Sequence, residues 1–345
     1  MLRRGIVLAI CIVCVSHARA DVVDLYIKDL KDKDDKVRAR AAYQLGSRGA
    51  AAKKAIPALM ESVKDANDEV KHNSIYALGE MGKEGSEAVP TLIDVMQKEK
   101  AVDTRCFAAQ ALGKIGPDED GKSLKALAAA LKVSDISKFA ADALGKFGPA
   151  GKEAAPALRE ALASPEAQKA AAAALAELGP DGVKQLQEAL TDKNEDVRIY
   201  ATGGIALLKK DAVPDLAKML QDKSVKVRIE AIGDLKDLGK DVFKGAIPAI
   251  IEVVKSDKDG GLRLRAIQML SELGPAAKDA VGALIDVLTK EKEQDLRLYA
   301  AEALGSIGPA AKDAIPALKA AAENKEEELV ADAAKAALKL IQDKK

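Results

Sequence analysis

The chain has 345 residues, of which 48% are hydrophobic and only 3% aromatic, and it contains no tryptophan. This composition argues against a conventional large core and leaves much of the packing to alanine. Lysine and arginine together number 54, as do aspartate and glutamate. The balance removes the usual electrostatic reason to expect nucleic acid or an anionic membrane surface as a partner, so we expect no nucleic-acid partner.

Residues 1–20 predict a secretory signal peptide. The segment MLRRG is basic, residues 6–15 form an apolar run, and Ala18 and Ala20 give an A-x-A cleavage pattern before Asp21. Ten apolar residues are too few to span a bilayer on their own. We therefore expect cleavage after Ala20, an extracytoplasmic (periplasmic or secreted) mature protein and no membrane span after cleavage. An uncleaved anchor is the alternative.

The mature chain offers little for catalysis. It would keep one cysteine, Cys106, and one histidine, His72, so an internal disulfide is excluded and a histidine-based metal or nucleophile site has little to draw on. The acidic run at residues 118–121 lacks the ligand spacing of a calcium loop, whose final glutamate is replaced by Ala129. We expect no metal, no cofactor, no catalytic residue and no enzymatic activity.

From residue 21 to residue 345 a helical pattern recurs ten times. Each unit has a large aliphatic anchor, and four residues before it stands a small residue, which is alanine in nine units and Ser74 in the tenth. A further apolar residue usually stands eight before the anchor, so the three positions form one stripe of a helix. The anchors, 30 to 35 residues apart, are Leu45, Leu78, Leu112, Leu144, Leu175, Ile205, Leu235, Leu270, Leu304 and Leu338.

Glycine and proline mark where each of these helices ends. Glycine stands four residues after the anchor in eight units, and proline often follows it directly. Glycine can adopt the left-handed cap that ends a helix, and proline is then tolerated in the first turn of the next one, as at Pro57 or Pro316. We therefore predict an all-α fold, an α-solenoid of about ten two-helix repeats whose stacking buries the stripes.

The pattern I-P-A-L-x-x-x-L-x-D…V-R-x-x-A-x-x-A-L-G-x-x-G-P resembles the HEAT repeat, and especially the short HEAT-like repeats of the phycobilisome lyase type. The best matches are residues 192–208, 222–239 and 296–318, and the resemblance covers residues 21–345. It implies an armadillo-like superhelix in which the second helix of each unit, the one that carries V-R-x-x-A, lines the concave face. No catalytic residue can be carried over with it.

A pair of opposite charges recurs in seven units. A basic residue directly follows the V, and an acidic residue stands six positions before it; the other three units lack both. This joint presence predicts one structural interaction that closes the loop between the helices and ties neighbouring units together. The pairs are Asp32 with Arg38, Asp65 with Lys71, Glu99 with Arg105, Asp192 with Arg198, Asp222 with Arg228, Asp257 with Arg263, and Glu291 with Arg297.

The middle of the array, about residues 118–210, is irregular. Its units are the shortest, two of them lack the charge pair, and Lys209 stands where glycine is usual. Whether this stretch is a hinge or a tighter rigid stack stays open.

Partner binding is predicted on the second helices, at residues two and six positions after the V and, for Tyr299, at position three. Four successive units carry a large aliphatic residue there, and exposed apolar rows usually mark binding sites. Packing between neighbouring helices is the open alternative. The candidate residues are Tyr43, His72, Tyr76, Ile199, Ile229, Leu264, Leu298 and Tyr299.

The sequence thus predicts an exported, monomeric, non-enzymatic scaffold that binds a protein or peptide along the concave face. Two alternatives stay open. One is a lyase-like or chaperone-like subunit, as the resemblance to phycobilisome lyase proteins implies, and the other is a purely structural spacer.

Overall fold

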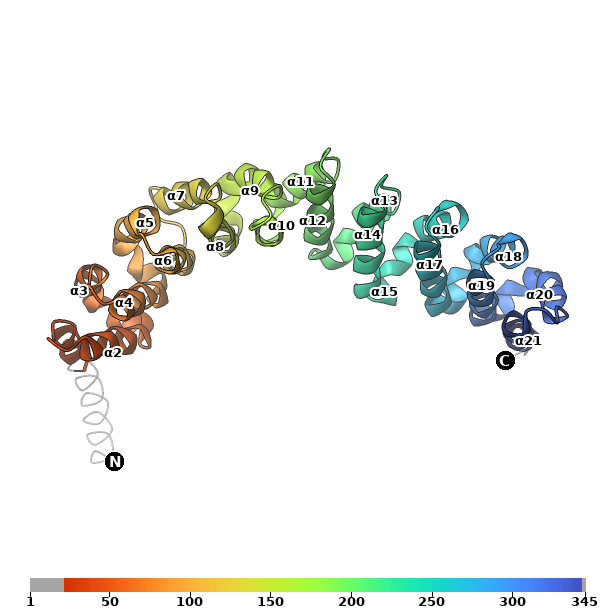
Figure 1. Ribbon diagram of the computed structural model, residues 1–345, viewed down its shortest axis with the longest axis horizontal. Helices are drawn as coiled ribbons and strands as arrows, with labels where there is room; N and C mark the ends of the chain where they lie inside the picture. Colours follow the sequence, from red (N-terminus) through yellow and green to blue (C-terminus); the bar gives the residue numbers. More distant parts are fainter. Residues whose placement is uncertain (1–21, 343–345) are drawn as a thin grey trace, which may run out of the picture. The chain divides into compact units, whose positions relative to one another are not determined.

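The computed structural model describes residues 22–342, which contain helices and turns but no strand (Figure 1). The predicted signal peptide lies outside these residues. Within them, two kinds of helix alternate along the chain. We call the helices that carry V-R-x-x-A, or its equivalent, B helices and those that precede them A helices. Consecutive A and B helices form two-helix units, as an α-solenoid requires.

The chain divides between Gln185 and Leu186 into two compact units of contact, which we describe separately as the N-terminal and the C-terminal segment. The boundary falls within α11 (Pro180–Ala189), inside the stretch that the sequence marks as irregular. The prediction of a hinge there stays a prediction.

In the N-terminal segment the B helices pack against one another in chain order, and α4, α6, α8 and α10 also pack against the A helix of their own unit. The B helices are α2 (Asp35–Gly46), α4 (Asp68–Glu80), α6 (Val102–Ile115), α8 (Ser134–Gly145) and α10 (Gln168–Glu177). The A helices are residues 22–29, α3 (Ile56–Ser62), α5 (Val89–Lys98), α7 (Lys122–Ala130) and α9 (Ala155–Ala161), with 3₁₀ segments η1 (Gly49–Ala55), η2 (Gly82–Ala88) and η3 (Gly148–Ala154).

The C-terminal segment repeats this arrangement. Its B helices are α12 (Glu195–Ala206), α14 (Val225–Asp237), α17 (Gly260–Leu273), α19 (Gln294–Ile307) and α21 (Glu328–Gln342). The helices between them are α13 (Val213–Met219), α15 (Lys240–Phe243), α16 (Ile247–Ser256), α18 (Val281–Lys290) and α20 (Ile315–Ala322), with 3₁₀ segments η4 (Lys209–Ala212), η5 (Lys244–Ala246), η6 (Gly274–Ala280) and η7 (Gly308–Ala314). No helix among residues 22–342 is long and apolar enough to cross a membrane.

The local sequence explains where the B helices begin and end. Five of them begin at a residue whose side chain accepts a hydrogen bond from a first-turn amide, such as Asn67 before α4. All eight glycines that the sequence marks as stop signals have positive φ. Lys209, which replaces this glycine in one unit, adopts φ 59 as well. The turn geometry therefore persists where the preferred residue is missing, at the expense of backbone strain at Lys209.

The predicted stripe forms the core. Nine of the ten anchors are buried, whereas Leu338 in α21 is half-buried and Ile341 is buried beside it. Successive B helices approach closely where the glycine of A-L-G meets an alanine of the next B helix. A Cβ added to Gly113 would lie 2.8 Å from the Cα of Ala143, and one added to Gly79 would lie 3.0 Å from the Cα of Ala111.

Gly113→Ala should therefore lower the free energy of unfolding by roughly 1–3 kcal/mol, because the added methyl group overpacks the contact between α6 and α8. The matched control is Gly233→Ala in α14, where an added Cβ would meet no atom within 4 Å. That variant should gain roughly 0.5–1 kcal/mol from helix propensity. Urea denaturation of both variants checks this, and equal effects would show that close backbone approach does not select the glycine.

Candidate functional site

On the B helices the residues three, six and ten positions after the V are exposed or half-buried, except for the buried Ala170 of α10. On α2 these are Arg40, Tyr43 and Ser47, and all three are exposed. Residues at this spacing share one side of a helix. We call the surface formed by these positions the B face. The prediction that position two also points outward is wrong for Ala39 and Cys106, which are buried, whereas Lys138 and Ile229 at the same position are exposed. The Cys106 Sγ lies 3.6 Å from the carbonyl oxygen of Asp135 in the next unit.

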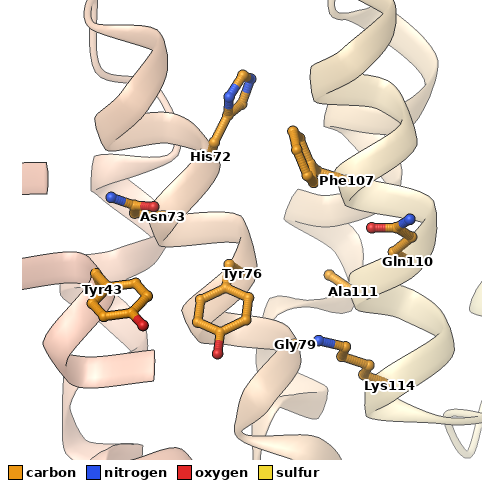
Figure 2. A pocket seen from close by; sticks show the side chains of 9 residues that line it. All are labelled: Tyr43, His72, Asn73, Tyr76, Gly79, Phe107, Gln110, Ala111 and Lys114. Carbon is orange, nitrogen blue, oxygen red and sulfur yellow. The ribbon is translucent and has the colours of Figure 1, made fainter. Parts of the chain in front are cut away.

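A hollow of about 260 Å³ opens on the B face of the N-terminal segment, across α2, α4 and α6 (Figure 2). We call it the aromatic pocket. The residues that line it are Tyr43, His72, Asn73, Tyr76, Gly79, Phe107, Gln110, Ala111 and Lys114.

Small residues leave room for the hollow. Gly79 has no side chain and Ala111 only a methyl group, and α4 and α6 meet closely at these two positions. Larger side chains one turn away form the walls, with Tyr76 from α4 and Phe107 from α6 (Figure 2). The close packing that stacks the units thus also creates the recess.

Aromatic rings on three successive B helices surround the recess. The rings of Tyr43 and Tyr76 are stacked, with centroids 6.0 Å apart and planes inclined by 15°. The His72 and Phe107 rings are tilted by 46° with centroids 4.7 Å apart. Tyr43 is 49% exposed and Phe107 is 39% exposed. In a chain with so few rings, their clustering in solvent calls for an explanation beyond core packing.

The polar groups of the pocket are partly engaged. His72 Nε2 lies 2.9 Å from Thr104 Oγ1, and the Asn73 amide donates to the Ala39 carbonyl at 3.0 Å. The Lys114 ammonium lies 5.0 Å from the centre of the Tyr76 ring and pairs with Glu80.

Other polar groups of the pocket remain available to a ligand. Within the part of the chain that the structure describes, no group hydrogen-bonds the Gln110 amide or the hydroxyls of Tyr43 and Tyr76. Lys114 is the only residue of the lining that always carries charge. The site therefore offers rings, free hydrogen-bonding groups and one cation.

We compared the sequence with models of known protein families. The family model of HEAT repeats matches residues 2–78, 23–105, 56–136, 89–179, 183–271 and 247–339. The chain belongs to the HEAT-repeat family.

Several solved structures share this HEAT-repeat fold. Kap121p is 14% identical with a TM-score of 0.57, and the match covers 93% of this chain and 41% of that chain. Kap121p bound to the SUMO protease Ulp1p gives a TM-score of 0.59 at 14% identity with the same coverage, and Kap121p bound to Nup53p gives 0.56. The chain thus spans about two fifths of Kap121p, and at this identity the likeness establishes the fold alone. No curated protein matches the sequence.

The structure brings three predicted binding residues, Tyr43, His72 and Tyr76, into the aromatic pocket. The sequence prediction missed Asn73, Phe107 and Lys114, which stand at positions three and ten after the V. It also missed Gln110, which stands at position six but is neither aliphatic nor aromatic. Phe107 carried a usable signal, since it is one of the few aromatic residues and lies at position three of a B helix.

The predicted aliphatic row lies on the B helices α12, α14, α17 and α19 of the C-terminal segment. Ile229 is 37% exposed. The other members are half-buried between neighbouring helices: Ile199, Leu264, Leu298 and, one position further, Tyr299. Both interpretations of the row, packing and binding, therefore stay open.

The recurring acidic and basic residues predicted from the sequence join neighbouring HEAT units, and we call this set of pairs the charge ladder. Arg38 of the first unit donates from Nε and Nη2 to the carboxylate of Asp65 in the second unit, at 2.7 and 2.9 Å. Its Nη1 donates to the backbone carbonyl of Asp32 at 2.8 Å. Arg198 and Arg228 make the same contacts with the carboxylates of the following units. The prediction of a side-chain pair within one unit is wrong, because the guanidinium reaches only the backbone of its own acidic residue.

Each acidic residue is held in place by its own loop. Asp65 Oδ1 accepts a hydrogen bond from the Asn67 amide at 2.9 Å, which orients the carboxylate toward Arg38 of the preceding unit. The hydrogen bond from Arg38 lowers the pKa of Asp65. Among residues 22–342 no basic side chain pairs with Asp32 or Asp192, and each carboxylate accepts a hydrogen bond from a backbone amide of its own loop, that of Asp34 or Asn194.

The other basic residues of the charge ladder form different ion pairs, depending on the acidic residue within reach. The Lys71 ammonium lies 3.0 Å from Asp68 and 3.8 Å from Glu99 of the next unit. Arg263 pairs with Glu291. Arg297 pairs with Glu327, which sequence reasoning missed because it stands two positions after the expected site.

Arg105 is the exception among the ladder arginines. The next unit has Leu131 at the acidic position, and Arg105 Nε donates to the Met96 carbonyl at 3.0 Å instead.

The described residues, 22–342, contain no group of three or more histidine, cysteine or acidic residues that could hold a metal ion. Cys106 is buried, and burial raises the pKa of its thiol, so the reactive thiolate is disfavoured.

Proposed function

We propose that this HEAT-repeat protein is an exported, monomeric, non-enzymatic scaffold that binds a protein or peptide along the B face, which corresponds to the concave face in HEAT-like stacks. The aromatic pocket is the observation that carries the proposal. Export rests on the pattern of residues 1–20 and is tested separately from binding.

The composition of the pocket supports binding rather than packing. Exposed rings leave apolar area in water that a partner can cover, and each covered ring stabilises a complex by burial and by aromatic contacts. The free Gln110 amide and the tyrosine hydroxyls can orient a polypeptide backbone.

The size of the pocket favours a polypeptide over a free small molecule. Small-molecule pockets usually enclose about 300–1,000 Å³, whereas this open hollow measures about 260 Å³. It can take one large side chain and leaves the rest of a partner on the B face. Kap121p binds other proteins in two of the similar structures, Ulp1p in one and Nup53p in the other, which supports a binding role by analogy.

The test is affinity purification of the mature protein from cells that produce it. A Tyr76→Ala, Phe107→Ala double variant should lose one specific partner that the wild type retains, with an unchanged melting curve. The control is Tyr26→Ala. Tyr26 lies on the first A helix, away from the B face, and its ring is covered by the Arg48 guanidinium. Retention of every partner by the double variant would favour the spacer alternative. The lyase-like or chaperone-like alternative stays a prediction, because no observation favours it.

A further inference from the structure

The N-terminal segment carries a row of rings that continues past the aromatic pocket. Successive B helices each contribute one ring to the B face: Tyr43 on α2, Tyr76 on α4, Phe107 on α6 and Phe139 on α8. These helices pack against one another in this order. We call these four residues the aromatic row. The stacked Tyr43 and Tyr76 rings form one platform. Phe107 lies on the next B helix, α6, and Phe139 lies on the one after it, α8.

The spacing of the row suits one kind of backbone. Packed helices lie about 8–10 Å apart. Tyr76 and Phe107 also differ by three positions along the helix, or about 4.5 Å, which together with the helix spacing separates their sites by about 9–11 Å. A polyproline II segment rises about 3.1 Å per residue with three residues per turn. It therefore presents every third side chain on one side at intervals of about 9 Å.

The polar groups suit this backbone as well. A polyproline II segment has no internal hydrogen bonds, and its prolines expose carbonyl acceptors without amide donors. The pocket supplies donors through the free Gln110 amide and the two tyrosine hydroxyls. Aromatic-lined grooves are a recurring means of binding proline-rich segments, since the preformed helix loses little entropy on binding.

The charged side chains beside the rings determine which residues are favoured between the prolines of such a ligand. The Lys114 ammonium lies 5.0 Å from the Tyr76 ring centre, and the Lys138 ammonium lies 5.9 Å from that of Phe139. Lys114 already pairs with Glu80, but Lys138 forms no ion pair with any residue in 22–342. Asp135 and Asp142 of α8 balance Lys138 and the capping Lys146, so the cation that matters is the Lys138 ammonium beside Phe139. An acidic residue of the ligand next to Phe139 would pair with this ammonium, and a basic residue would be repelled by it.

We propose that the aromatic row binds a proline-rich segment with proline at every third position and acidic residues between the prolines. The inference rests on the proposed function and specifies the partner of the same site. Successive prolines cover the Tyr43–Tyr76 platform, Phe107 and Phe139.

The test uses synthetic peptides. The probe is Pro-Glu-Ala repeated four times with one added tryptophan, whose fluorescence is read without background because the protein has none. We expect saturable binding that Phe107→Ala or Tyr76→Ala weakens at least about ten-fold and Tyr26→Ala leaves unchanged. A scrambled peptide without the proline period, and a Pro-Lys-Ala repeat, should bind at least about ten-fold more weakly. Equal binding of either control peptide, or no binding of the probe, would overturn the proposal.

A random peptide library selected on the same protein separates this inference from the broader function. Selected peptides that lack the proline period but still require Tyr76 and Phe107 would leave the proposed function standing and overturn the proline chemistry. A library with no peptide that depends on these rings would count against both. Circular dichroism melts of each variant verify that the fold is retained.

Discussion

Replacement of Asp234 by alanine is expected to stabilise the protein at about pH 8. Asp234 lies on α14 seven positions after the V, where α4 has Ala77 and α6 has Ala111. Its Oδ2 atom is buried and has no hydrogen-bond partner within residues 22–342. Burial, and to a lesser extent the neighbouring charges of Glu230 and Asp237, raises its pKa from 3.8 to about 7. The folded protein thus holds an unpaired carboxylate at neutral and higher pH.

The sign of the pH dependence follows from this shift. The folded state binds the proton more tightly than the unfolded state, so Asp234 favours folding below about pH 4, where it is protonated in both states. This contribution declines as the pH rises toward about 7 and is lost above it. A rise from 3.8 to about 7 corresponds to ~4 kcal/mol. Because the side chain keeps some contact with solvent, we expect a gain of about 2–4 kcal/mol for Asp234→Ala at about pH 8.

Urea denaturation of wild type and Asp234→Ala between about pH 4 and pH 8 measures the effect. The difference between the two proteins should grow with pH and nearly vanish at the acid end. Asp142→Ala, a change of an exposed aspartate on the B helix α8, is the control and should have little effect. A difference that stays constant with pH would show that Asp234 is not the titrating group.

Replacement of Arg198 by alanine should cost about 3–5 kcal/mol, because it leaves the buried Asp222 carboxylate without its cation. The Arg198 and Asp222 side chains are only 3% and 9% exposed. Arg198 also donates to two backbone carbonyls of its own loop, at 2.9 and 3.2 Å. The change therefore removes the link between α12 and the loop before α14. It also removes the hydrogen bonds that hold the loop before α12.

Arg105→Ala is the matched control for loss of the Arg198–Asp222 ion pair. Arg105 occupies the same position in its unit but has no acid to reach, so its loss should cost only about 1 kcal/mol for one hydrogen bond. Thermal melting followed by circular dichroism compares the two variants. Similar losses from both would mean that the carboxylate pairing between units contributes nothing measurable.

The repeat architecture could be predicted from sequence because its signals are local. A stripe such as Ala300 and Leu304, followed by Gly308 with φ 70, specifies one helix and its end without reference to distant residues. The 3₁₀ segments that follow the glycines were not predicted. They depend on how the chain must turn to start the next helix, and the sequence pattern does not distinguish them from an ordinary turn.

The ladder shows where local signals end. The Arg38 guanidinium bonds the backbone carbonyl of Asp32, which any residue would offer, while its carboxylate partner is Asp65 of the next unit. Both residues recur with the same period, so joint occurrence cannot tell a partner within a unit from one in the next. Only the stacking of units decides between them.

The binding site was predictable in part for a similar reason. Tyr43 and Tyr76 stood out as rare rings, but the outward direction of Asn73 and Lys114, at positions three and ten, depends on how each B helix is rotated against its neighbours. That rotation is set by the contact of Gly79 with Ala111, in which two backbones approach each other.

Site-specific photocrosslinking tests the central claim, that a partner occupies the B face of the N-terminal segment. A photoreactive side chain at Gln110 reports on the aromatic pocket, and one at the exposed Lys125 of α7 reports on an A helix of the same segment. In cells that produce the protein, position 110 should crosslink to one protein or peptide partner, and position 125 should not. Crosslinks to the same partner from position 125 alone, or equally from both positions, would contradict the proposal.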